Sequence, residues 1–69
     1  MRENFNFGKQ LKQAREEKGL TRLELASLIG VQYYNISDWE TNRSEPNFLV
    51  LVNLCRVLDT TPNDLFDFN

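Results

Sequence analysis

The sequence predicts an all-α protein, a compact bundle of five short helices that form one domain over residues 1–69. Three observations carry this prediction. Apolar residues recur three and four positions apart along the chain, and helix start and stop residues separate these runs. No segment alternates apolar and polar residues as a half-buried strand does. A chain of 69 residues is long enough for one small core.

The first helix is predicted by Phe7, Leu11 and Ala14, which lie on one apolar stripe with charged residues between them. Gly19 is expected to end this helix in the left-handed conformation, which glycine adopts without a steric penalty.

The second helix is predicted to begin at Arg22, directly after Thr21. The Thr21 hydroxyl can accept a hydrogen bond from the backbone N–H of Glu24, while the Glu24 carboxylate accepts one from the N–H of Thr21. This capping box marks a helix start, and Gly30 marks the end two turns later. The apolar residues of this helix are Leu25, Ala26, Leu28 and Ile29.

A third helix is expected from Gln32 to Thr41, after a short turn that contains Gly30. Ile36 and Trp39 lie three residues apart and are expected to face inward. Two short helices joined by a glycine-containing turn are typical of helix-turn-helix geometry. We place this unit at about residues 22–41.

A loop is expected from Asn42 to Pro46, where an asparagine tolerates positive φ. Thr61 followed by Pro62 predicts the start of a short fifth helix, because proline is favoured at the first helical position. Between them the fourth helix is predicted by apolar residues at helical spacing, namely Phe48, Leu51, Leu54, Cys55 and Leu58.

The residue types present exclude several kinds of chemistry. The chain has no histidine and one cysteine, so the usual nitrogen and sulfur ligands of a transition metal are lacking. Without a histidine base or a credible cysteine nucleophile we expect no enzyme, and no cofactor or small-molecule ligand. No stretch reaches the length of a membrane span and no signal peptide is evident, which predicts a cytoplasmic protein without a membrane partner.

The net charge of −2 argues against a nucleic-acid partner, because DNA affinity rests largely on neutralising phosphates. The charges are unevenly distributed, however. The first 22 residues hold six Lys and Arg against three Asp and Glu, while the remaining residues hold two against seven. This asymmetry leaves room for a locally positive face.

A set of residues at fixed spacing runs through the chain, namely Leu11, Arg15, Gly19-Leu20-Thr21, Leu25-Ala26, Ile29-Gly30-Val31, Ile36-Ser37, Trp39-Glu40, Pro46, Leu51 and Leu58. From about residue 7 to 66 this pattern resembles the Cro and phage-repressor-like helix-turn-helix family, also called the XRE family. The resemblance implies a lambda-repressor-like bundle in which the second and third helices read double-stranded DNA. It also implies a homodimer on a pseudo-palindromic site.

The resemblance further implies which residues form the DNA site. An α-helix fits the major groove, and the N-terminal residues of the third helix then reach the base edges. Arg15 and Glu40 match a family pair that bridges the first and third helices, and we interpret them as a structural ion pair. The expected base-reading residues are Tyr33, Tyr34, Ser37 and Asp38. The expected phosphate contacts are Arg22, Gln32, Asn42, Arg43, Ser44 and Asn47.

The roles of the two tyrosines and of Asp38 each have an alternative. The tyrosines can contact thymine methyl groups and phosphates, or one of them can complete the core beside Trp39. Asp38 can accept a hydrogen bond from a cytosine amino group, or it can be a solvated acid that tunes specificity by repulsion.

A spare apolar surface is also predicted, because five residues exceed what one small core needs: Leu23, Leu49 and Val50, with Phe5 and Phe68 near the ends. We expect a homodimer built from the fourth helix, the fifth helix and the tail. The function expected from all these features is that of a small, nucleoid-associated transcriptional regulator, a repressor. The alternative is a protein-interaction module, antitoxin- or anti-repressor-like, with weak or no DNA binding.

Overall fold

Five helices make up the part of the chain, residues 7–66, that the computed structural model describes. They are α1 (Phe7–Glu17), α2 (Arg22–Ile29), α3 (Tyr33–Glu40), α4 (Phe48–Leu58) and α5 (Pro62–Phe66), and this range contains no strand. The predicted all-α, five-helix architecture is therefore confirmed. None of the helices within residues 7–66 has the length and apolar character needed to cross a membrane.

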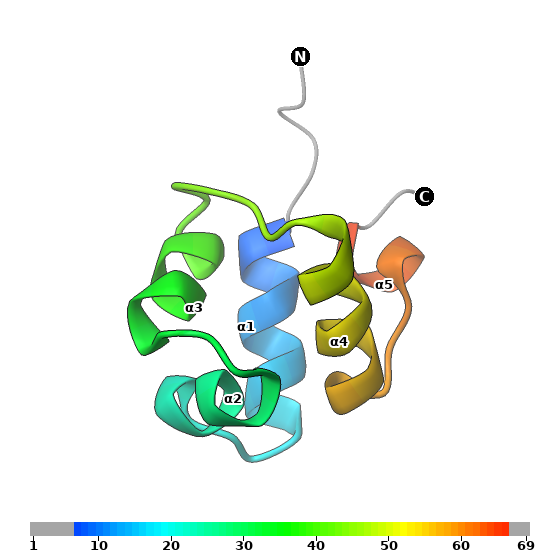
Figure 1. Ribbon diagram of the computed structural model, residues 1–69. Coiled ribbons are helices and arrows are strands. Elements are labelled where there is room, and N and C mark those ends of the chain that lie inside the picture. Colours follow the sequence, from blue (N-terminus) through cyan, green and yellow to red (C-terminus); the bar gives the residue numbers. More distant parts are fainter. Residues whose placement is uncertain (1–6, 67–69) are drawn as a thin grey trace.

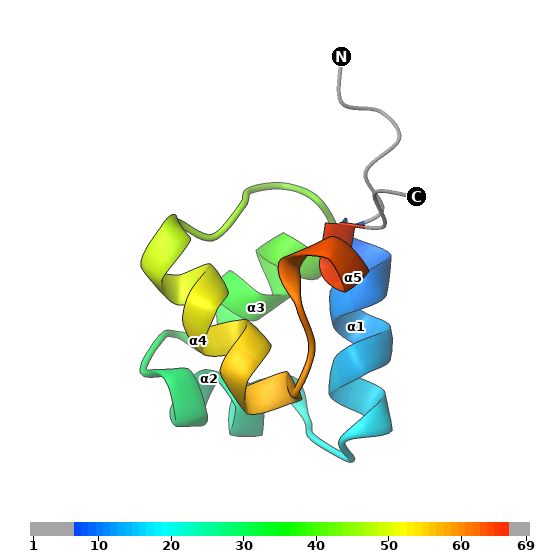
Figure 2. The ribbon, with the colours of Figure 1, turned by 90° about the vertical axis from the view of Figure 1, so that its right-hand side faces the viewer.

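The helix α1 lies at the centre of the bundle, with α2 and α3 on one side and α4 and α5 on the other (Figure 1). The loop over residues 41–47 joins α3 to α4 across the first turn of α1. Figure 2 shows α5 beside that same turn, where the rings of Phe7 and Phe66 stack with centroids 4.9 Å apart. Both ends of the described chain therefore meet at one end of the bundle.

The core forms where the five helices meet. Each helix contributes one large side chain that is fully buried, and these five are Leu11, Leu25, Ile36, Leu54 and Leu65. Helices of 5 to 11 residues are too short to be stable alone in water, so each depends on this shared burial. The core consequently fixes how α2 and α3 are presented to solvent.

The start of α2 and the stops after α1 and α2 lie where the sequence predicts them, whereas α3 is one residue shorter at each end than the predicted range from Gln32 to Thr41. Thr21 Oγ1 accepts from the N–H of Glu24 at 3.0 Å, and Glu24 Oε1 accepts from the N–H of Thr21 at 2.8 Å. This geometry confirms the predicted capping box. Gly19 and Gly30 adopt φ values of 72° and 76° after α1 and α2, which confirms both predicted stops.

An apolar residue of α2 is exposed, and two apolar residues of α4 differ from their predicted positions. Leu28, one of the apolar residues of α2, is 59% exposed, whereas Leu25 and Ala26 of the same helix are buried. Phe48 is 73% exposed, since it is the first residue of α4 and lies at the edge of the buried stripe. Val50, expected on the spare surface, is instead half-buried and packs against the core.

Candidate nucleic-acid interface

The segment predicted to read DNA folds as α3, preceded by Gln32 as its N-cap and followed by Thr41 as its C-cap. Ile36 and Trp39 are buried on its inner side, as the sequence predicts. The Gln32 side chain makes no capping hydrogen bond and is exposed, so its amide is free to contact a ligand. The core thus holds α3 firmly while its outer side stays accessible.

The outer side of α3 begins with two tyrosines. Tyr33 is 53% exposed and Tyr34 is 59% exposed, so the interpretation that one of them completes the core is wrong. Ser37 and Asp38 are half-buried one turn further along. Tyr34 and Asp38 lie four residues apart and are therefore neighbours on the helix surface. No described residue forms an ion pair or a side-chain hydrogen bond with the Asp38 carboxylate.

The loop after α3 and the start of α4 carry the other predicted phosphate contacts. Arg43 and Ser44 are exposed in this loop. Asn42 adopts φ 62°, as predicted, and its Oδ1 accepts a hydrogen bond from the N–H of Gly8 at 3.1 Å. Asn47 caps α4, because its Oδ1 accepts from the N–H of Val50 at 2.9 Å. Neither hydrogen bond is among the features predicted from the sequence, although an asparagine just before an apolar helix is a known N-cap signal.

Arg15 and Glu40 form an ion pair between α1 and α3, and both residues are buried. Arg15 Nε donates to Glu40 Oε2 at 2.6 Å, and Arg15 Nη2 donates to Glu40 Oε1 at 3.2 Å. Arg15 Nη1 donates to the carbonyl oxygen of Leu20 at 2.7 Å. The hydrogen bonds with Glu40 raise the pKa of Arg15 above its ordinary value, so the guanidinium stays charged.

Arg22 joins this ion pair. Its Nε donates to Glu40 Oε1 at 2.9 Å, and its side chain is 36% exposed. Nothing in the sequence pattern predicts this contact, because the two residues lie 18 positions apart and only the packing of α2 on α3 brings them together. Arg22, predicted as a phosphate contact, is thus both anchored to the protein and open to solvent.

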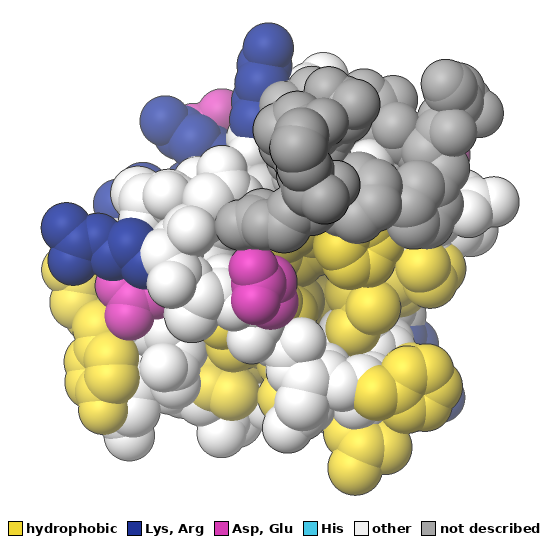
Figure 3. Space-filling view, turned by 90° about the horizontal axis from the view of Figure 1, so that it is seen from above, with side chains coloured by type: hydrophobic (Ala, Val, Ile, Leu, Met, Phe, Trp, Pro, Cys, Tyr) yellow, Lys and Arg dark blue, Asp and Glu magenta, His cyan; other side chains and the backbone are white. Residues whose placement is uncertain are grey.

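The charges on this surface are mixed. Seen from above, Lys and Arg side chains gather on the side where α3 lies in Figure 1, with acidic side chains among them (Figure 3). Hydrophobic side chains emerge on both sides of the same view, beside the cations on the side of α3 and on the side of α4. The candidate interface itself exposes Arg22 and Arg43 as cations and also contains the half-buried Asp38. Contacts other than simple charge attraction therefore have to contribute to any DNA affinity.

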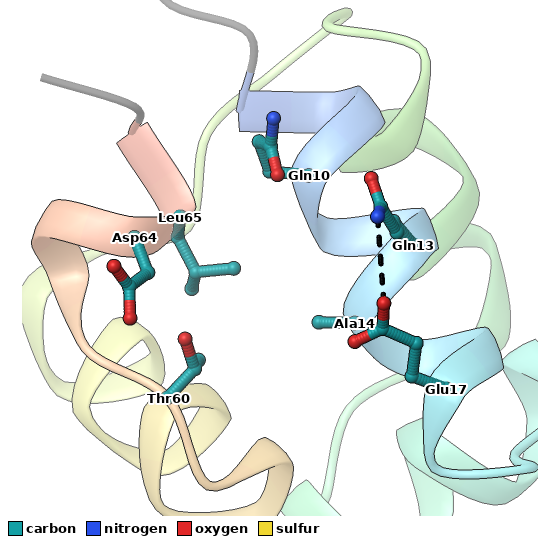
Figure 4. A pocket seen from close by; sticks show the side chains of 7 residues that line it. All are labelled: Gln10, Gln13, Ala14, Glu17, Thr60, Asp64 and Leu65. Atoms are coloured by element: carbon teal, nitrogen blue, oxygen red, sulfur yellow. Dashed lines mark hydrogen bonds between the residues drawn. The ribbon is translucent and has the colours of Figure 1, made fainter. Parts of the chain in front are cut away.

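A hollow of about 200 Å³ lies elsewhere, between α1 and α5 (Figure 4). Its lining includes Glu17 and Asp64 but no cation, and Gln13 Nε2 donates to Glu17 Oε2 at 3.4 Å across one turn of α1. A hollow that carries acidic side chains and no cation does not suit a phosphate, so we do not count it as part of the candidate interface.

Comparison with known proteins gives matches over most of the chain. A family model described as helix-turn-helix matches residues 11–65. Multiprotein-bridging factor 1 of Debaryomyces hansenii is 42% identical over 55 residues, which make up 80% of this chain and 37% of that protein. The chain therefore spans little more than a third of the length of this relative.

Two of the solved structures that are similar to this chain were determined in complex with DNA or an operator. The P22 c2 repressor, in complex with a synthetic operator, superposes with a TM-score of 0.85 at 27% identity, over 91% of this chain and 96% of that one. SinR, a master regulator for biofilm formation in complex with DNA, superposes with a TM-score of 0.78 at 36% identity. That match covers 84% of this chain and 97% of SinR.

Proposed function

The chain belongs to the Cro and phage-repressor-like family of helix-turn-helix proteins, and on this premise we propose that it binds double-stranded DNA sequence-specifically as a transcriptional repressor. The observation that carries the proposal is the outer side of α3, which stays accessible while Ile36 and Trp39 anchor the helix in the core. A rigid helix with its N-terminal side chains free is what reading the major groove requires. This role would place the protein in the nucleoid.

In this proposal α3 reads the bases with Tyr33, Tyr34, Ser37 and Asp38. The two exposed tyrosines offer rings for thymine methyl groups and hydroxyls for phosphates. The Asp38 carboxylate, which no described side chain pairs with, can accept a hydrogen bond from a cytosine amino group.

Phosphate contacts on either side would position α3 in the groove. The first-turn N–H groups of α2 and α4 favour anions, and the exposed Arg43 adds a positive charge in the loop before α4. The half-exposed Arg22 lies at the start of α2. The full set that we propose comprises Arg22, Gln32, Asn42, Arg43, Ser44 and Asn47.

A homodimer would allow two copies of α3 to read a pseudo-palindromic site. The support for a homodimer is the exposed apolar side chains at the start of α4, where Leu49 is 71% exposed next to Phe48. Phe5 and Phe68, which the sequence analysis adds to this surface, lie outside the described residues. Pairing would also double the number of cations that face the DNA.

A protein-interaction module is the second candidate, and a specific surface favours it. Leu23 is 68% exposed on α2, and a hollow of about 320 Å³ nearby is bordered by Leu20, Glu24, Ser27 and Leu28. The name multiprotein-bridging factor, carried by the relative from Debaryomyces hansenii, points in the same direction.

The experiment that separates the two candidates is selection of bound sequences from a random duplex library, followed by salt titration of the best site. We expect a two-fold-symmetric site. Arg22→Ala should weaken binding to all sequences alike, and it should reduce the salt slope, the steepness with which the log of the binding constant falls with the log of the salt concentration, by about 1. Tyr34→Ala should instead relax the preference at one base position.

Arg56→Ala is the matched control for Arg22→Ala, because Arg56 is exposed in the last turn of α4, outside the proposed interface. It should leave the affinity and the salt slope close to those of the wild type. If no sequence is enriched and the residual binding is sequence-blind, the DNA-reading proposal is wrong and the protein-interaction module takes its place.

A further inference from the structure

The carboxylate of Glu40 accepts hydrogen bonds from two arginines that belong to different helices. Arg15 of α1 donates through Nε and Nη2, and Arg22 of α2 donates through Nε. Glu40 itself is the last residue of α3. One carboxylate therefore joins all three helices next to the start of α2.

Arg15 is held in place by its contacts. Its guanidinium bonds to both oxygens of Glu40 and to the carbonyl oxygen of Leu20, and 8% of the side chain is exposed. Because Arg15 holds both carboxylate oxygens, the orientation of Glu40 is fixed from within the core. The Arg15 charge also balances the Glu40 charge, so the positive charge of Arg22 is not cancelled.

Arg22 uses only one edge of its guanidinium in the folded protein. Its Nε is bonded to Glu40, whereas no described residue bonds to Nη1 or Nη2, which carry four N–H donors. The residue is also the first of α2, where the backbone N–H groups of the first turn favour an anion. The free edge of the guanidinium thus belongs to the residue that begins this helix.

We infer that Glu40 is a positioning residue for DNA binding: it holds the Nε edge of Arg22 so that the Nη edge meets a DNA phosphate at the start of α2. This inference rests on the proposed function. A free arginine loses much rotamer freedom when it binds, and an arginine already held at Nε loses less. Its two Nη groups then suit the bidentate geometry of a phosphate.

A double-mutant cycle on the selected duplex tests this inference. The four proteins are the wild type, Glu40→Gln, Arg22→Ala and the double variant, each measured under conditions where circular dichroism shows it folded. We expect Glu40→Gln to weaken binding roughly fivefold in the wild-type background, in line with the cost of immobilising one long side chain. In the Arg22→Ala background the same change should have no further effect. An equal loss in both backgrounds would show that Glu40 acts only through stability.

Arg22→Lys provides a second test that leaves Glu40 in place. Lysine keeps the positive charge, but it has no Nε edge that could bond to Glu40 while two further nitrogen atoms donate to a phosphate. We expect Arg22→Lys to keep the salt slope of the wild type but to bind the selected duplex roughly fivefold more weakly. Arg56→Lys, at the exposed position on α4, is the matched control and should bind as the wild type does. Wild-type affinity for Arg22→Lys would overturn the inference.

A measurement on the wild type alone covers the case in which Glu40→Gln does not fold. The Arg22 Nε–H signal in nitrogen-edited NMR should exchange slowly with water, both without DNA and with the selected duplex bound, while DNA binding shifts the Nη signals. Loss of Nε–H protection on binding would show that Arg22 leaves Glu40 to reach the phosphate. Failure of the wild type to bind any duplex would instead refute the proposed function, and this inference with it.

Discussion

The backbone N–H of Gly8 donates a hydrogen bond to Oδ1 of Asn42 at 3.1 Å, although the two residues lie 34 positions apart. Gly8 lies in the first turn of α1, where backbone N–H groups have no partner within the helix. Asn42, held in the left-handed conformation, supplies that partner from the loop after α3. This contact ties the proposed phosphate-binding loop to the central helix of the bundle.

The first prediction concerns Gly8. A Cβ at this position would overlap the carbonyl oxygen of Glu40 and lie 2.9 Å from Asn42 Oδ1. We expect Gly8→Ala to lower the free energy of unfolding by about 1–3 kcal/mol, although alanine favours helices, because the overlap involves rigid backbone. Chemical denaturation measures this change.

Gly19→Ala is a control for Gly8→Ala that introduces backbone strain without steric overlap. A Cβ at Gly19 meets nothing within 4 Å, but the φ of 72° is unfavourable for alanine, so we expect a loss of about 1 kcal/mol from backbone strain alone. If Gly8→Ala unfolds at a higher denaturant concentration than the wild type, the loop yields to the added methyl group and the close packing is unimportant.

The second prediction separates the two roles of Asn42. Asn42→Asp keeps an oxygen that can accept from the Gly8 N–H, so stability should change by less than about 0.5 kcal/mol. DNA affinity should fall, because a carboxylate replaces an amide that can donate to phosphate. Asn53→Asp, exposed on α4, is the matched control and should bind DNA more tightly than Asn42→Asp. Equal affinities for the two variants would remove Asn42 from the phosphate contacts.

The third prediction concerns the buried ion pair. Arg15→Ala leaves the Glu40 carboxylate buried without its main partner, so we expect a loss of about 3–5 kcal/mol in the free energy of unfolding. Lys18→Ala is the control, because the ion pair between Lys18 and Asp59 is exposed at 3.9 Å and contributes less than about 1 kcal/mol. At a temperature where Arg15→Ala is folded, its base preference should be that of the wild type. An unaltered melting temperature combined with lost DNA binding would assign Arg15 to the DNA contact instead.

The fourth prediction tests the capping box of α2. Thr21→Ala removes the oxygen that accepts from the Glu24 N–H, and we expect a loss of about 1 kcal/mol in the free energy of unfolding. Ser27→Ala, at an exposed position inside the same helix, should have little effect or stabilise slightly. A denaturation midpoint unchanged by Thr21→Ala would mean that the cap contributes nothing in solution.

The fifth prediction is a pH dependence that arises from Cys55. Burial raises the pKa of this thiol, so the folded protein favours the neutral form more strongly than the unfolded chain does. The resulting stability is complete below the pKa of an unfolded thiol, about 8.5, and is lost as the pH rises above it. The difference in unfolding free energy between the wild type and Cys55→Ala should therefore shrink between pH 8 and 10. A constant difference over this range would show that the thiol does not titrate differently in the two states.

The outer side of α3 shows how far sequence reasoning reaches into the site. The spacing of Ile36 and Trp39 predicts their burial, because helical periodicity alone assigns the two faces of α3. The exposure of Tyr33 and Tyr34 is not predictable in the same way. Either ring could have completed the core, and it is the packed bundle that leaves both of them more than half exposed.

By itself the sequence determined the features that depend on interactions within one turn of chain, such as the capping box of Thr21 and Glu24 and the left-handed stops at Gly19 and Gly30. The tertiary structure alone decided that Arg22 bonds to Glu40 and that Asn42 caps α1 at Gly8. The two pairs lie 18 and 34 positions apart in the sequence, so the distance between their side chains depends on how whole helices pack. That packing is set by the volumes of the side chains that fill the shared core.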